Sequence, residues 1–380
     1  MNYIIQFLLY CPRVYAGLDH LMVELSAQAA AKGSRVVCVY CDTLEGMPQI
    51  QQDIEAAGGI VEVISGELRQ QRRDIRRLYR KYKPEVINTH FEMRAKLCTS
   101  VYSILFGAKH FTYVHSLLGD VAQYRRTKGL VRRCVLGVYY GLLTALSREV
   151  FCASEAIRRE YMAWKYGKGR NVRTMYIGTQ LLAPRYTQAQ ARELIGLPLD
   201  TRIVANVSAI EPIKGIDLII KAVEQLKQRG KKVLFVHIGG LRAETEEQRE
   251  YACSLRRLAE QIGVADEVVW LGRRTDVQDI LPLADVYVHP SYSEGLGSVL
   301  LEASMAGLPL VGTEVGGISE VVVEKQTGVL VKIGDVCGLA QSIEYALQHP
   351  EMGDRAYQYV CRYFDQQKQA QEILKHYIEQ

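Results

Sequence analysis

Residues 289–317, with the sequence HPSYSEGLGSVLLEASMAGLPLVGTEVGG, limit the choice of fold more strongly than any other segment. An apolar run at 285–289 predicts a buried strand that ends at Pro290, and a glycine-containing turn then leads into a predicted helix over 298–305. Free backbone N–H groups in such a turn, together with the dipole of the following helix, bind anions. We therefore expect an anion-binding loop between this strand and this helix.

Two carboxylates flank the loop, with seven residues between them. Glu294 lies in the predicted turn, and Glu302 lies about one turn inside the predicted helix, near enough to its start to meet a ligand over the loop. A second strand-to-helix glycine turn has the sequence PIKGID at residues 212–217. Its Lys214 would contact an anion bound at that turn.

Strands and helices alternate along the chain, which is typical of α/β domains with doubly wound parallel sheets. At 380 residues the chain exceeds what one hydrophobic core usually organises. Because the pattern restarts after Pro184, we expect an N-terminal domain at 1–184, a C-terminal domain at 185–350 and a helical, polar tail at 351–380. The predicted strands are 3–10, 35–41, 60–64, 85–90, 110–115, 149–153, 172–177, 202–208, 232–238, 268–271, 285–289 and 310–312. The predicted helices are 18–32, 47–57, 67–82, 92–106, 128–147, 154–165, 216–229, 244–262, 276–283 and 298–305.

Three residues of the first domain lie at the carboxyl ends of predicted strands, where ligands of open α/β sheets bind. Gly17 occupies a strand-to-helix turn, although an ordinary turn explains it equally well. His90 and His115 each end a predicted strand, so both rings would project from the same edge of the sheet. A lone histidine there is more often structural, but two on one edge favour a site. His115 is the better candidate because a loop follows it directly.

Charge is distributed unevenly. Residues 1–185 contain 27 Lys and Arg against 15 Asp and Glu, a net charge of +12, whereas the remainder contains 20 against 27. The basic stretch at 69–83 fits a solvated helix face better than an anionic membrane surface. The stretch at 124–143 leads from basic residues into an apolar, tyrosine-bearing helix, and it fits either an anionic membrane surface or a solvated face. The basic residues of this second stretch are Arg125, Arg126, Lys128, Arg132 and Arg133. No nucleic-acid-binding module accompanies the charge, so we expect no nucleic-acid partner.

The cysteines and the N-terminus indicate a compartment. Nine cysteines are scattered along the chain, and the CxxC spacing of Cys38 and Cys41 falls within a predicted strand without a second pair or a nearby histidine. No signal peptide or membrane-spanning run is apparent in the sequence. We therefore expect a protein of the reducing cytoplasm, located peripherally on the inner face of the membrane if the basic stretch binds lipid.

The block from Pro290 to Val322 closely resembles the E-x7-E signature of family-four retaining glycosyltransferases, with Glu294 and Glu302 as its two carboxylates. The similarity extends over nearly the whole chain. Gly17 matches the first glycine loop of the family, His90 and His115 match its strand-end histidines, PIKGID matches its lysine turn, and VFCASEAIRRE matches a late N-domain strand and helix. The resemblance implies the GT-B architecture, in which two Rossmann-like domains face each other across a cleft and the C-terminal helix crosses back to the first domain.

The resemblance also implies a nucleotide diphosphate sugar as donor, with no metal or other cofactor. The diphosphate would bind to loop N–H groups and Lys214, Glu302 would accept hydrogen bonds from the ribose, and Glu294 would bind the sugar and orient its anomeric carbon. His115 would reach the donor sugar or phosphate. Glu294, His115 and Lys214 are thus the predicted catalytic residues. The residues predicted to bind the donor are Gly17, Lys214, Arg273, Glu294, Gly295, Leu296, Gly297, Ser298 and Glu302.

The activity that follows from the resemblance is sugar transfer with retention of configuration to a glycan or lipid-linked acceptor, in the assembly of cell-surface polysaccharide or lipopolysaccharide. Two departures from the family pattern qualify it. The segment 208–210 reads Ser-Ala-Ile where the family has Gly-Arg-Leu, so a diphosphate-binding arginine is absent, and Arg273 or Arg274 would have to compensate. The Pro-Asn-Gly turn is changed in the segment 176–180.

Other functions stay open on these residues. The alanine at position 209 is compatible with a catalytically silent subunit that binds a nucleotide sugar and supports a partner transferase. A nicotinamide-dependent oxidoreductase is disfavoured, because no GxGxxG follows the first strand. Nucleotide-sugar epimerases share the fold, but the E-x7-E block argues against them.

Overall fold

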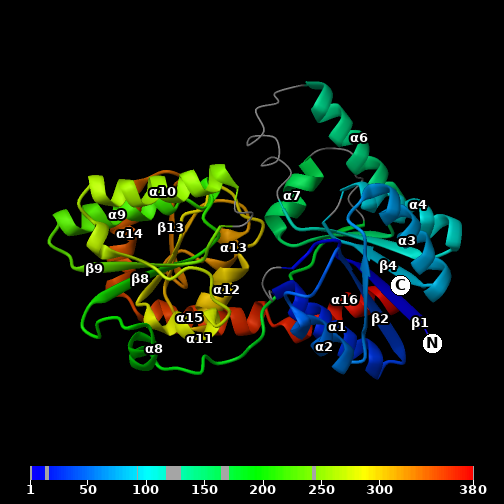
Figure 1. Ribbon diagram of the computed structural model, residues 1–380, viewed down its shortest axis with the longest axis horizontal. Coiled ribbons are helices and arrows are strands. Elements are labelled where there is room, and N and C mark those ends of the chain that lie inside the picture. Colours follow the sequence, from blue (N-terminus) through cyan, green and yellow to red (C-terminus); the bar gives the residue numbers. More distant parts are fainter. Residues whose placement is uncertain are drawn as a thin grey trace. The chain divides into compact units, whose positions relative to one another are not determined.

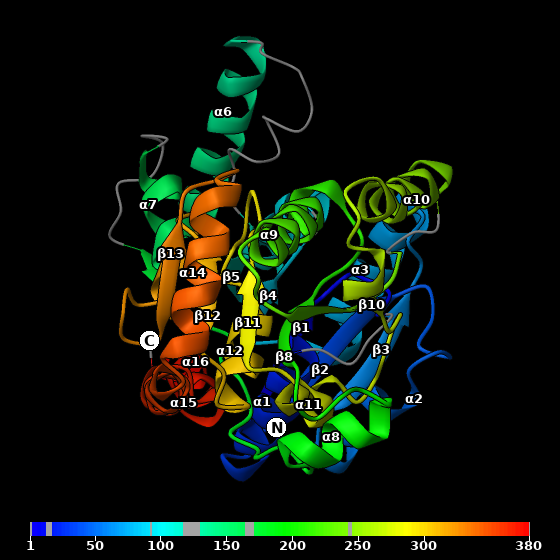
Figure 2. The same cartoon turned by 90° about the vertical axis from the view of Figure 1, so that its left-hand side faces the viewer.

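The computed structural model describes residues 2–12, 17–91, 93–116, 130–163, 171–241 and 245–379. The chain forms two compact units (Figures 1 and 2). The first contains residues 1–180 and 365–380, and the second contains residues 181–364. Each unit is built around one parallel sheet with helices on both faces.

The first unit contains a seven-stranded sheet in the order β3-β2-β1-β4-β5-β6-β7, and all its described strand pairs are parallel. Its strands are β1 (Asn2–Phe7), β2 (Ser34–Cys41), β3 (Ile60–Ile64), β4 (Val86–Thr89), β5 (Lys109–Val114), β6 (Glu149–Cys152) and β7 (Val172–Thr174). Its helices are α1 (Gly17–Ala31), α2 (Pro48–Ala56), α3 (Leu68–Tyr82), α4 (Met93–Phe106), α6 (Leu130–Leu146), α7 (Glu155–Ala163) and α16 (Gln366–Ile378).

Alternating side chains of these strands build a core on each side of the sheet, because successive residues of a strand point to opposite faces. Ile4 of β1 packs with α1 and α16, whereas its neighbour Ile5 packs with α3. Cys38 and Cys41 divide in the same way, each buried in a different core, and neither forms a disulfide with a described residue. Their CxxC spacing therefore reflects strand packing, as predicted.

The second unit contains a six-stranded parallel sheet in the order β10-β9-β8-β11-β12-β13. Its strands are β8 (Arg202–Val207), β9 (Val233–Ile238), β10 (Val268–Trp270), β11 (Val286–His289), β12 (Leu310–Thr313) and β13 (Gly328–Val331). Its helices are α8 (Gln188–Ile195), α9 (Ile216–Gln228), α10 (Glu246–Gln261), α11 (Val277–Ile280), α12 (Ser298–Met305), α13 (Ile318–Val321), α14 (Val336–Gln348) and α15 (Glu351–Tyr363). Three short 3₁₀ turns are η1 (Pro212–Lys214), η2 (Ala265–Glu267) and η3 (Leu281–Leu283).

The chain reverses its direction of growth along this second sheet between β8 and β11, which are neighbours although β9 and β10 come between them in sequence. Ligands of open α/β sheets bind at such a switch point, outside the carboxyl ends of the strands. The turns that follow β8 and β11 contain Lys214 and Glu294, so the topology brings these two segments to one edge. Residues of α9, α10 and α14 cover one face of the sheet in a single apolar core.

Most predicted elements agree with the structure, although β7 ends at Thr174 rather than at residue 177 and α8, β13 and α14 were not predicted. Three further corrections apply. β1 ends at Phe7 rather than at residue 10, because Leu9 adopts a left-handed backbone with φ of 58°. The predicted helix over 276–283 is one turn, α11, followed by η3, since Pro282 has no N–H to continue an α-helix.

The third correction concerns the tail at 351–380, which forms two helices that belong to different units. α15 packs against α12 within the second unit, with Gly353 so close to the carbonyl of Gly307 that an added Cβ would lie 1.9 Å from it. Only α16 belongs to the first unit, where it packs along α1. Asp365 caps α16 by accepting a hydrogen bond from the N–H of Gln367.

Candidate active site

The loop between β11 and α12 is the segment that the sequence placed at the centre of the site. Gly297 is the N-cap residue directly before α12 and has a φ of 80°, a conformation that favours glycine. A Cβ at this position would lie 3.0 Å from Leu300 and 3.3 Å from Glu294, so a larger residue would also crowd the carboxylate. Gly297 therefore permits the sharp turn that places Glu294 next to the helix start.

The turn after β8 holds this loop from one side. The N–H of Tyr292 donates to the carbonyl of Ile213 at 2.8 Å, and the hydroxyl of Ser291 donates to the same carbonyl at 3.0 Å. A Cβ at Gly215 would lie 2.3 Å from the carbonyl oxygen of Pro290, so only glycine fits between the two turns. Two segments that are about 80 residues apart in sequence thus form one rigid edge.

The carboxylate of Glu294 has two basic partners. Lys214 Nζ donates to its Oε2 at 2.6 Å, and His289 Nε2 lies 3.1 Å from the same oxygen. Lys214 and Glu294 are half-buried, with side-chain exposures of 16% and 19%, and His289 is buried. Burial opposes ionisation of Glu294, but the His289 hydrogen bond and the Lys214 charge outweigh it and lower its pKa to about 2.

The backbone N–H groups at the start of α12 are available to a ligand. No residue in the described ranges accepts a hydrogen bond from the N–H of Leu296, Gly297 or Ser298. The first N–H groups of a helix have no intrahelical acceptor, and they carry the positive end of the helix dipole. Lys214 is joined to this loop by its ion pair with Glu294. The loop therefore combines a cation with available N–H groups, as an anion site requires.

Glu302 lies on α12 and differs from Glu294 in its partners and in its pKa. It is half-buried, and its carboxylate makes no hydrogen bond or ion pair with any residue that the structure describes. Burial without such a partner raises its pKa to about 7. Both carboxylates lie near the buried ring of Tyr287, which connects them to the sheet. Glu302 is therefore a partly protonated acid whose two oxygens can meet a ligand.

The two arginines expected to replace the missing diphosphate arginine are engaged elsewhere. Arg274 forms a bidentate ion pair with Asp276, at 2.8 and 2.6 Å. Arg273 donates from Nη2 to the carbonyl of Leu241 at 2.7 Å. Among the described residues, no contact joins either guanidinium to Lys214 or Glu294. The assignment of Arg273 to the donor therefore stays a prediction.

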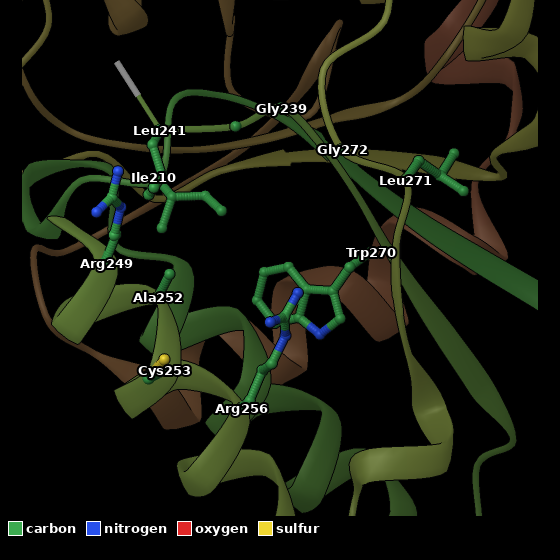
Figure 3. A pocket seen from close by; sticks show the side chains of 11 residues that line it. Ile210, Gly239, Leu241, Arg249, Ala252, Cys253, Arg256, Trp270, Leu271 and Gly272 are labelled. Carbon is green, nitrogen blue, oxygen red and sulfur yellow. The ribbon is translucent and has the colours of Figure 1, made fainter. Parts of the chain in front are cut away.

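A separate cavity of about 540 Å³ lies in the second unit between α10 and the ends of β9 and β10 (Figure 3). Arg249 and Arg256 of α10 border it, and the Arg256 guanidinium lies 5.9 Å from the centre of the Trp270 ring. None of the residues predicted to bind the donor lines this cavity. It is thus distinct from the loop that contains Glu294.

In the first unit, the two predicted histidines lie against each other. His90 Nδ1 and His115 Nε2 are 2.9 Å apart, and their rings stack at 5.1 Å between centroids. Burial and the nearby Lys96 charge lower the pKa of His90 to about 3, and burial with the neighbouring His90 and Lys96 lowers the pKa of His115 well below its usual value. Both imidazoles are consequently neutral at physiological pH.

Gly17 is the first residue of α1 and lies beside the turn that replaces the Pro-Asn-Gly of the family. Its Cα faces the carbonyl of Gly178 and the side chain of Ile177, with contact distances of 3.8 and 3.9 Å for an added Cβ. Gln366 of α16 donates to the Gly17 carbonyl at 2.8 Å. The structure therefore brings two loops of the family pattern together, with α16 joining them. Tyr15 and Ala16, which precede Gly17, lie outside the described residues.

Sequence reasoning missed two contributors to these clusters. His289 ends β11 and binds Glu294, and the rule applied to His90 and His115, a histidine at the end of a strand, would have found it. Gln6 is buried in β1 and accepts a hydrogen bond from His90 at 3.0 Å. Its only sequence signature was a polar residue within an apolar strand.

The described ranges contain neither a candidate metal site nor a helix that could span a membrane. No group of three or more His, Cys, Asp or Glu side chains in these ranges could hold a metal ion. No helix in them has the length and apolar character needed to span a membrane.

Comparison with known proteins finds relatives of the second unit. Residues 187–361 match the sequence profile of the family described as Glycosyl transferases group 1. The chain is 31% identical over 183 residues to D-inositol 3-phosphate glycosyltransferase 2 of Catenulispora acidiphila, covering 46% of this chain and 42% of that protein. It is 29% identical over 184 residues to N-acetyl-alpha-D-glucosaminyl L-malate synthase of Bacillus anthracis, covering 47% and 46%. The chain thus spans less than half the length of these curated relatives.

The whole chain resembles a solved structure. The crystal structure of Anabaena HepE in complex with UDP superposes with a TM-score of 0.80 at 17% identity, with 100% of both chains covered. At this identity the similarity establishes the fold, which is the GT-B fold with two Rossmann-like units. Residues 187–361, which fall within the second unit, are thus similar to the Glycosyl transferases group 1 family.

Proposed function

We propose that this chain is a retaining, metal-independent glycosyltransferase that moves a sugar from a nucleotide diphosphate sugar to a glycan or lipid-linked acceptor. The observation that carries the proposal is the cluster of Lys214, His289 and Glu294 at the start of α12, beside N–H groups without a described acceptor. The family match supports it, as do a relative named as a glycosyltransferase and the UDP bound by HepE.

The chemistry of each group fits one part of such a donor. The diphosphate binds the N–H groups of Leu296, Gly297 and Ser298 and takes the charge of Lys214, which is paired with Glu294 in the structure. Glu302 accepts hydrogen bonds from the two ribose hydroxyls, which act as donors to its oxygens. Glu294 then binds the sugar hydroxyls.

Catalysis in this proposal depends on position and on stabilisation of the leaving group. The bond between the anomeric carbon and the phosphate oxygen breaks while the acceptor oxygen forms its bond on the same face of the sugar. The proton of the acceptor hydroxyl passes to the departing phosphate oxygen. Lys214 and the helix start stabilise the charge that develops on the diphosphate, and Glu294 holds the sugar in place. His115 and Gly17 are assigned to donor contacts by the family resemblance alone.

The acceptor class and the location extend the proposal. A basic first unit suits an acceptor that is anionic or anchored in an anionic bilayer, as in the assembly of cell-surface polysaccharide or lipopolysaccharide. We assign the enzyme to the cytoplasmic face of the membrane, because nucleotide sugars are cytoplasmic substrates. Arg125 and Arg126, two of the expected lipid contacts, lie outside the described residues, and Arg132 and Arg133 belong to α6.

A thermal-shift panel of nucleotide diphosphate sugars tests the donor class. A ligand that binds only the folded state raises Tm by mass action. We expect one nucleotide series to raise Tm in the wild type and to lose most of that shift in Lys214→Met. A panel with no stabilising nucleotide sugar, in a chain that melts cooperatively, would contradict the proposal.

A second candidate function follows from the alanine at position 209, which stands where the family has an arginine. A silent subunit would bind the donor but would not transfer sugar. Calorimetric binding of a nucleotide sugar, combined with neither hydrolysis nor transfer across an acceptor panel, would favour this alternative. Restoration of transfer by Ala209→Arg would show that the missing guanidinium is the cause.

A further inference from the structure

Helices α3, α4 and α6 are neighbours in the first unit, and together they carry an excess of positive charge. α4 packs against α3 and also against α6 (Figure 1). α3 contains seven Lys or Arg and a single acid, Asp74, whereas α4 and α6 contain no Asp or Glu at all. We call the outer surface of these three helices the α3–α4–α6 layer.

Most cations of α3 have no counterion in the described part of the chain. Arg77 lies 3.7 Å from Asp74, and Lys81 lies 2.6 Å from Glu62 of β3. The remaining arginines of the helix are exposed and form no ion pair with any described residue: Arg69, Arg72, Arg73, Arg76 and Arg80. The buried side of α3 is held by Ile75, Leu78 and Tyr79, so the cations have no role in the core.

Large apolar side chains are also exposed on α4 and α6. At the end of α4, Ile104 is 62% exposed and Leu105 is 69% exposed, and on α6 Val138 is 65% exposed. The exposed Phe106 of α4 packs against Tyr79 of α3 with ring centroids 5.4 Å apart, so the apolar group adjoins the cationic helix. Clustered exposed apolar residues usually mark an interaction surface.

We infer that the α3–α4–α6 layer docks on an anionic lipid bilayer, with the α3 arginines at the headgroups and the apolar residues of α4 and α6 in the interface. This combination is what interfacial binding needs, since cations attract anionic headgroups and aliphatic side chains enter the boundary of the acyl chains. The inference deepens the proposed function, because it supplies the surface that would bring the enzyme to a lipid-linked acceptor.

Other partners fit this layer less well. A second copy of the chain would oppose like charges across the interface, because α3 has one acid and its two neighbours have none. A nucleic acid would use the arginines, but aliphatic residues such as Ile104, Leu105 and Val138 would gain little from a phosphate backbone. An anionic bilayer can contact both the cations of α3 and the exposed apolar residues of α4 and α6.

Sedimentation of the full chain with vesicles tests the inference without any measurement of transfer. Vesicles of phosphatidylcholine alone are compared with vesicles that contain 30% phosphatidylglycerol (a chosen composition, roughly that of an anionic leaflet). The charge variant carries Arg72→Gln, Arg73→Gln, Arg76→Gln and Arg80→Gln, and the apolar variant carries Ile104→Ser and Leu105→Ser. The matched control neutralises four exposed cations of the second unit: Lys232→Gln, Arg249→Gln, Arg257→Gln and Lys332→Gln.

The wild type and the control should bind the anionic vesicles and not the neutral ones, and added salt should weaken binding. The charge variant should bind at least about 100-fold more weakly, on the basis of about 1 kcal/mol for each basic residue at the surface. The apolar variant should bind about tenfold more weakly with an unchanged salt dependence. Circular dichroism melts and donor affinity should stay as in the wild type for all three, so a failure here is separable from a failure of the proposed function.

Three outcomes would overturn the inference. The first is no binding of the wild type to anionic vesicles at low salt, and the second is an equal loss in the control variant. The third is binding to heparin or RNA with no binding to vesicles and no effect of Ile104→Ser and Leu105→Ser, which would assign the layer to a soluble polyanion.

A second inference rests on a different observation, a buried hydrogen-bond chain from α16 to His115. Tyr377 of α16 accepts a hydrogen bond from Gln6 Nε2 at 3.2 Å. The Gln6 oxygen accepts from Asn88 at 3.0 Å and lies 3.0 Å from His90 Nε2, and His90 Nδ1 faces His115 Nε2 at 2.9 Å. The members of this chain other than His115 are at least nine-tenths buried.

This series of hydrogen bonds fixes which nitrogen of His115 carries the proton. The Gln6 oxygen can only accept, so His90 Nε2 carries a hydrogen and donates it at 3.0 Å. Asn88 Nδ2 lies 3.1 Å from the same nitrogen, but it donates a hydrogen to the Gln6 oxygen. A neutral His90 then has a bare Nδ1, which accepts from His115 Nε2–H. His115 is left with a bare Nδ1, which no residue in the described ranges occupies. The geometry assigns Gln6 and Tyr377 as positioning residues that hold His115 ready to accept a hydrogen bond from a ligand hydroxyl.

Nitrogen-15 NMR of the labelled full chain tests this assignment, since it distinguishes protonated from bare imidazole nitrogens. In the wild type His115 should show one form, with Nε2 protonated. Gln6→Leu should produce a mixture of both tautomers, and Tyr377→Phe, which keeps the Gln6 oxygen, should produce a smaller change. Glu372→Gln, on the exposed side of α16, should have no effect.

A proton on Nδ1 of His115 in the wild type would overturn the assignment. So would an unchanged His115 spectrum in a folded Gln6→Leu protein. If Gln6→Leu does not fold, Tyr377→Phe decides, because the loss of one hydroxyl leaves the packing of the ring in place. The role of His115 in transfer belongs to the proposed function, and the tautomer is measured without a substrate.

Discussion

Glu294 lies in the loop before α12 and Glu302 lies on α12, yet the pKa values of the two carboxylates are shifted in opposite directions. Glu294 has Lys214 and His289 as partners, and its pKa is lowered to about 2. The Glu302 carboxylate has no partner among the described residues, and burial raises its pKa to about 7. One carboxylate is ionised and fixed before any ligand arrives, whereas the other is half protonated at neutral pH.

This difference in partners and protonation indicates a different role for each carboxylate. The Glu294 carboxylate is held by neighbours that keep it rigid, as a group that must orient a reacting sugar should be. Glu302 receives no hydrogen bond from the described part of the chain, and a ribose with two adjacent hydroxyls would supply two. Glu294 therefore has partners among the described residues and Glu302 has none, so variants at the two positions should differ in kind.

Glu294→Gln should have the largest effect. It keeps the size of the side chain but removes the charge that Lys214 and His289 hold. We expect kcat to fall by about 10³-fold while the donor Kd changes by less than about threefold, because a preorganised charge acts mainly in the transition state. Steady-state kinetics and calorimetry measure the two quantities. A variant with wild-type kcat would remove Glu294 from the reaction.

Lys214→Met should act mainly on donor affinity, since it removes the only cation seen beside the loop N–H groups in the described chain. The donor Kd should rise by about 100-fold, the magnitude of a charge-assisted contact to phosphate. The pKa of Glu294 should also rise, because one of the groups that lower it is removed. Calorimetry and a carbon-13 titration check the two parts. Lys221→Met, which removes an exposed lysine paired with Asp217, is the matched control.

Glu302→Gln should weaken donor binding by about 30-fold with a smaller change in kcat, because a ribose contact is made equally in the ground state and the transition state. Interactions with the base or the diphosphate do not depend on the ribose hydroxyls. Comparison of ribose and 2′-deoxyribose donors therefore sharpens the test. The wild type should prefer the ribose donor, and the variant should not distinguish the two.

The same Glu302→Gln change should stabilise the protein when no donor is added. This effect is the smallest of those predicted, but it is the most distinctive. A carboxyl whose pKa is raised on folding costs stability once the unfolded chain ionises, so the cost grows between pH 4.5 and about 7 and then stays constant. The variant should melt a few degrees higher at pH 8, about 3 °C for a gain on the order of 1 kcal/mol, and the gain should shrink toward pH 5. For Glu294, whose pKa is lowered, Gln should instead lower Tm at pH 8.

The sequence predicted the fold and the content of this loop well for physical reasons. The buried strands of a parallel sheet are short apolar runs. A Cβ at Gly215 would collide with the Pro290 carbonyl, and one at Gly297 would crowd Leu300 and Glu294. The pairing of Glu294 with Lys214 could be expected once both were placed after neighbouring strands. The position of α16 was also anticipated, but its separation from α15 was not, because both segments are polar and helical.

What the sequence could not supply were contacts set by tertiary packing. His289 was visible only as the end of a strand, and Gln6 as an interruption of an apolar run. The protonation of Glu302 depends on the surroundings that the fold gives it, which no local pattern records. Arg273 and Arg274 were plausible by position, but their guanidinium groups bind Leu241 and Asp276.

Before donor binding, Glu302 is partly protonated and Glu294 is ionised, and we propose that the ribose then binds the Glu302 carboxylate. Proton release on donor binding tests this claim most directly, by calorimetry at pH 6.5 in buffers of different ionisation enthalpy, with the nucleotide sugar selected in the thermal-shift panel. With a pKa of about 7 for Glu302, the wild type should release well over half a proton per donor bound, and Glu302→Gln should release none. Binding of the donor to the wild type without proton release would contradict the claim.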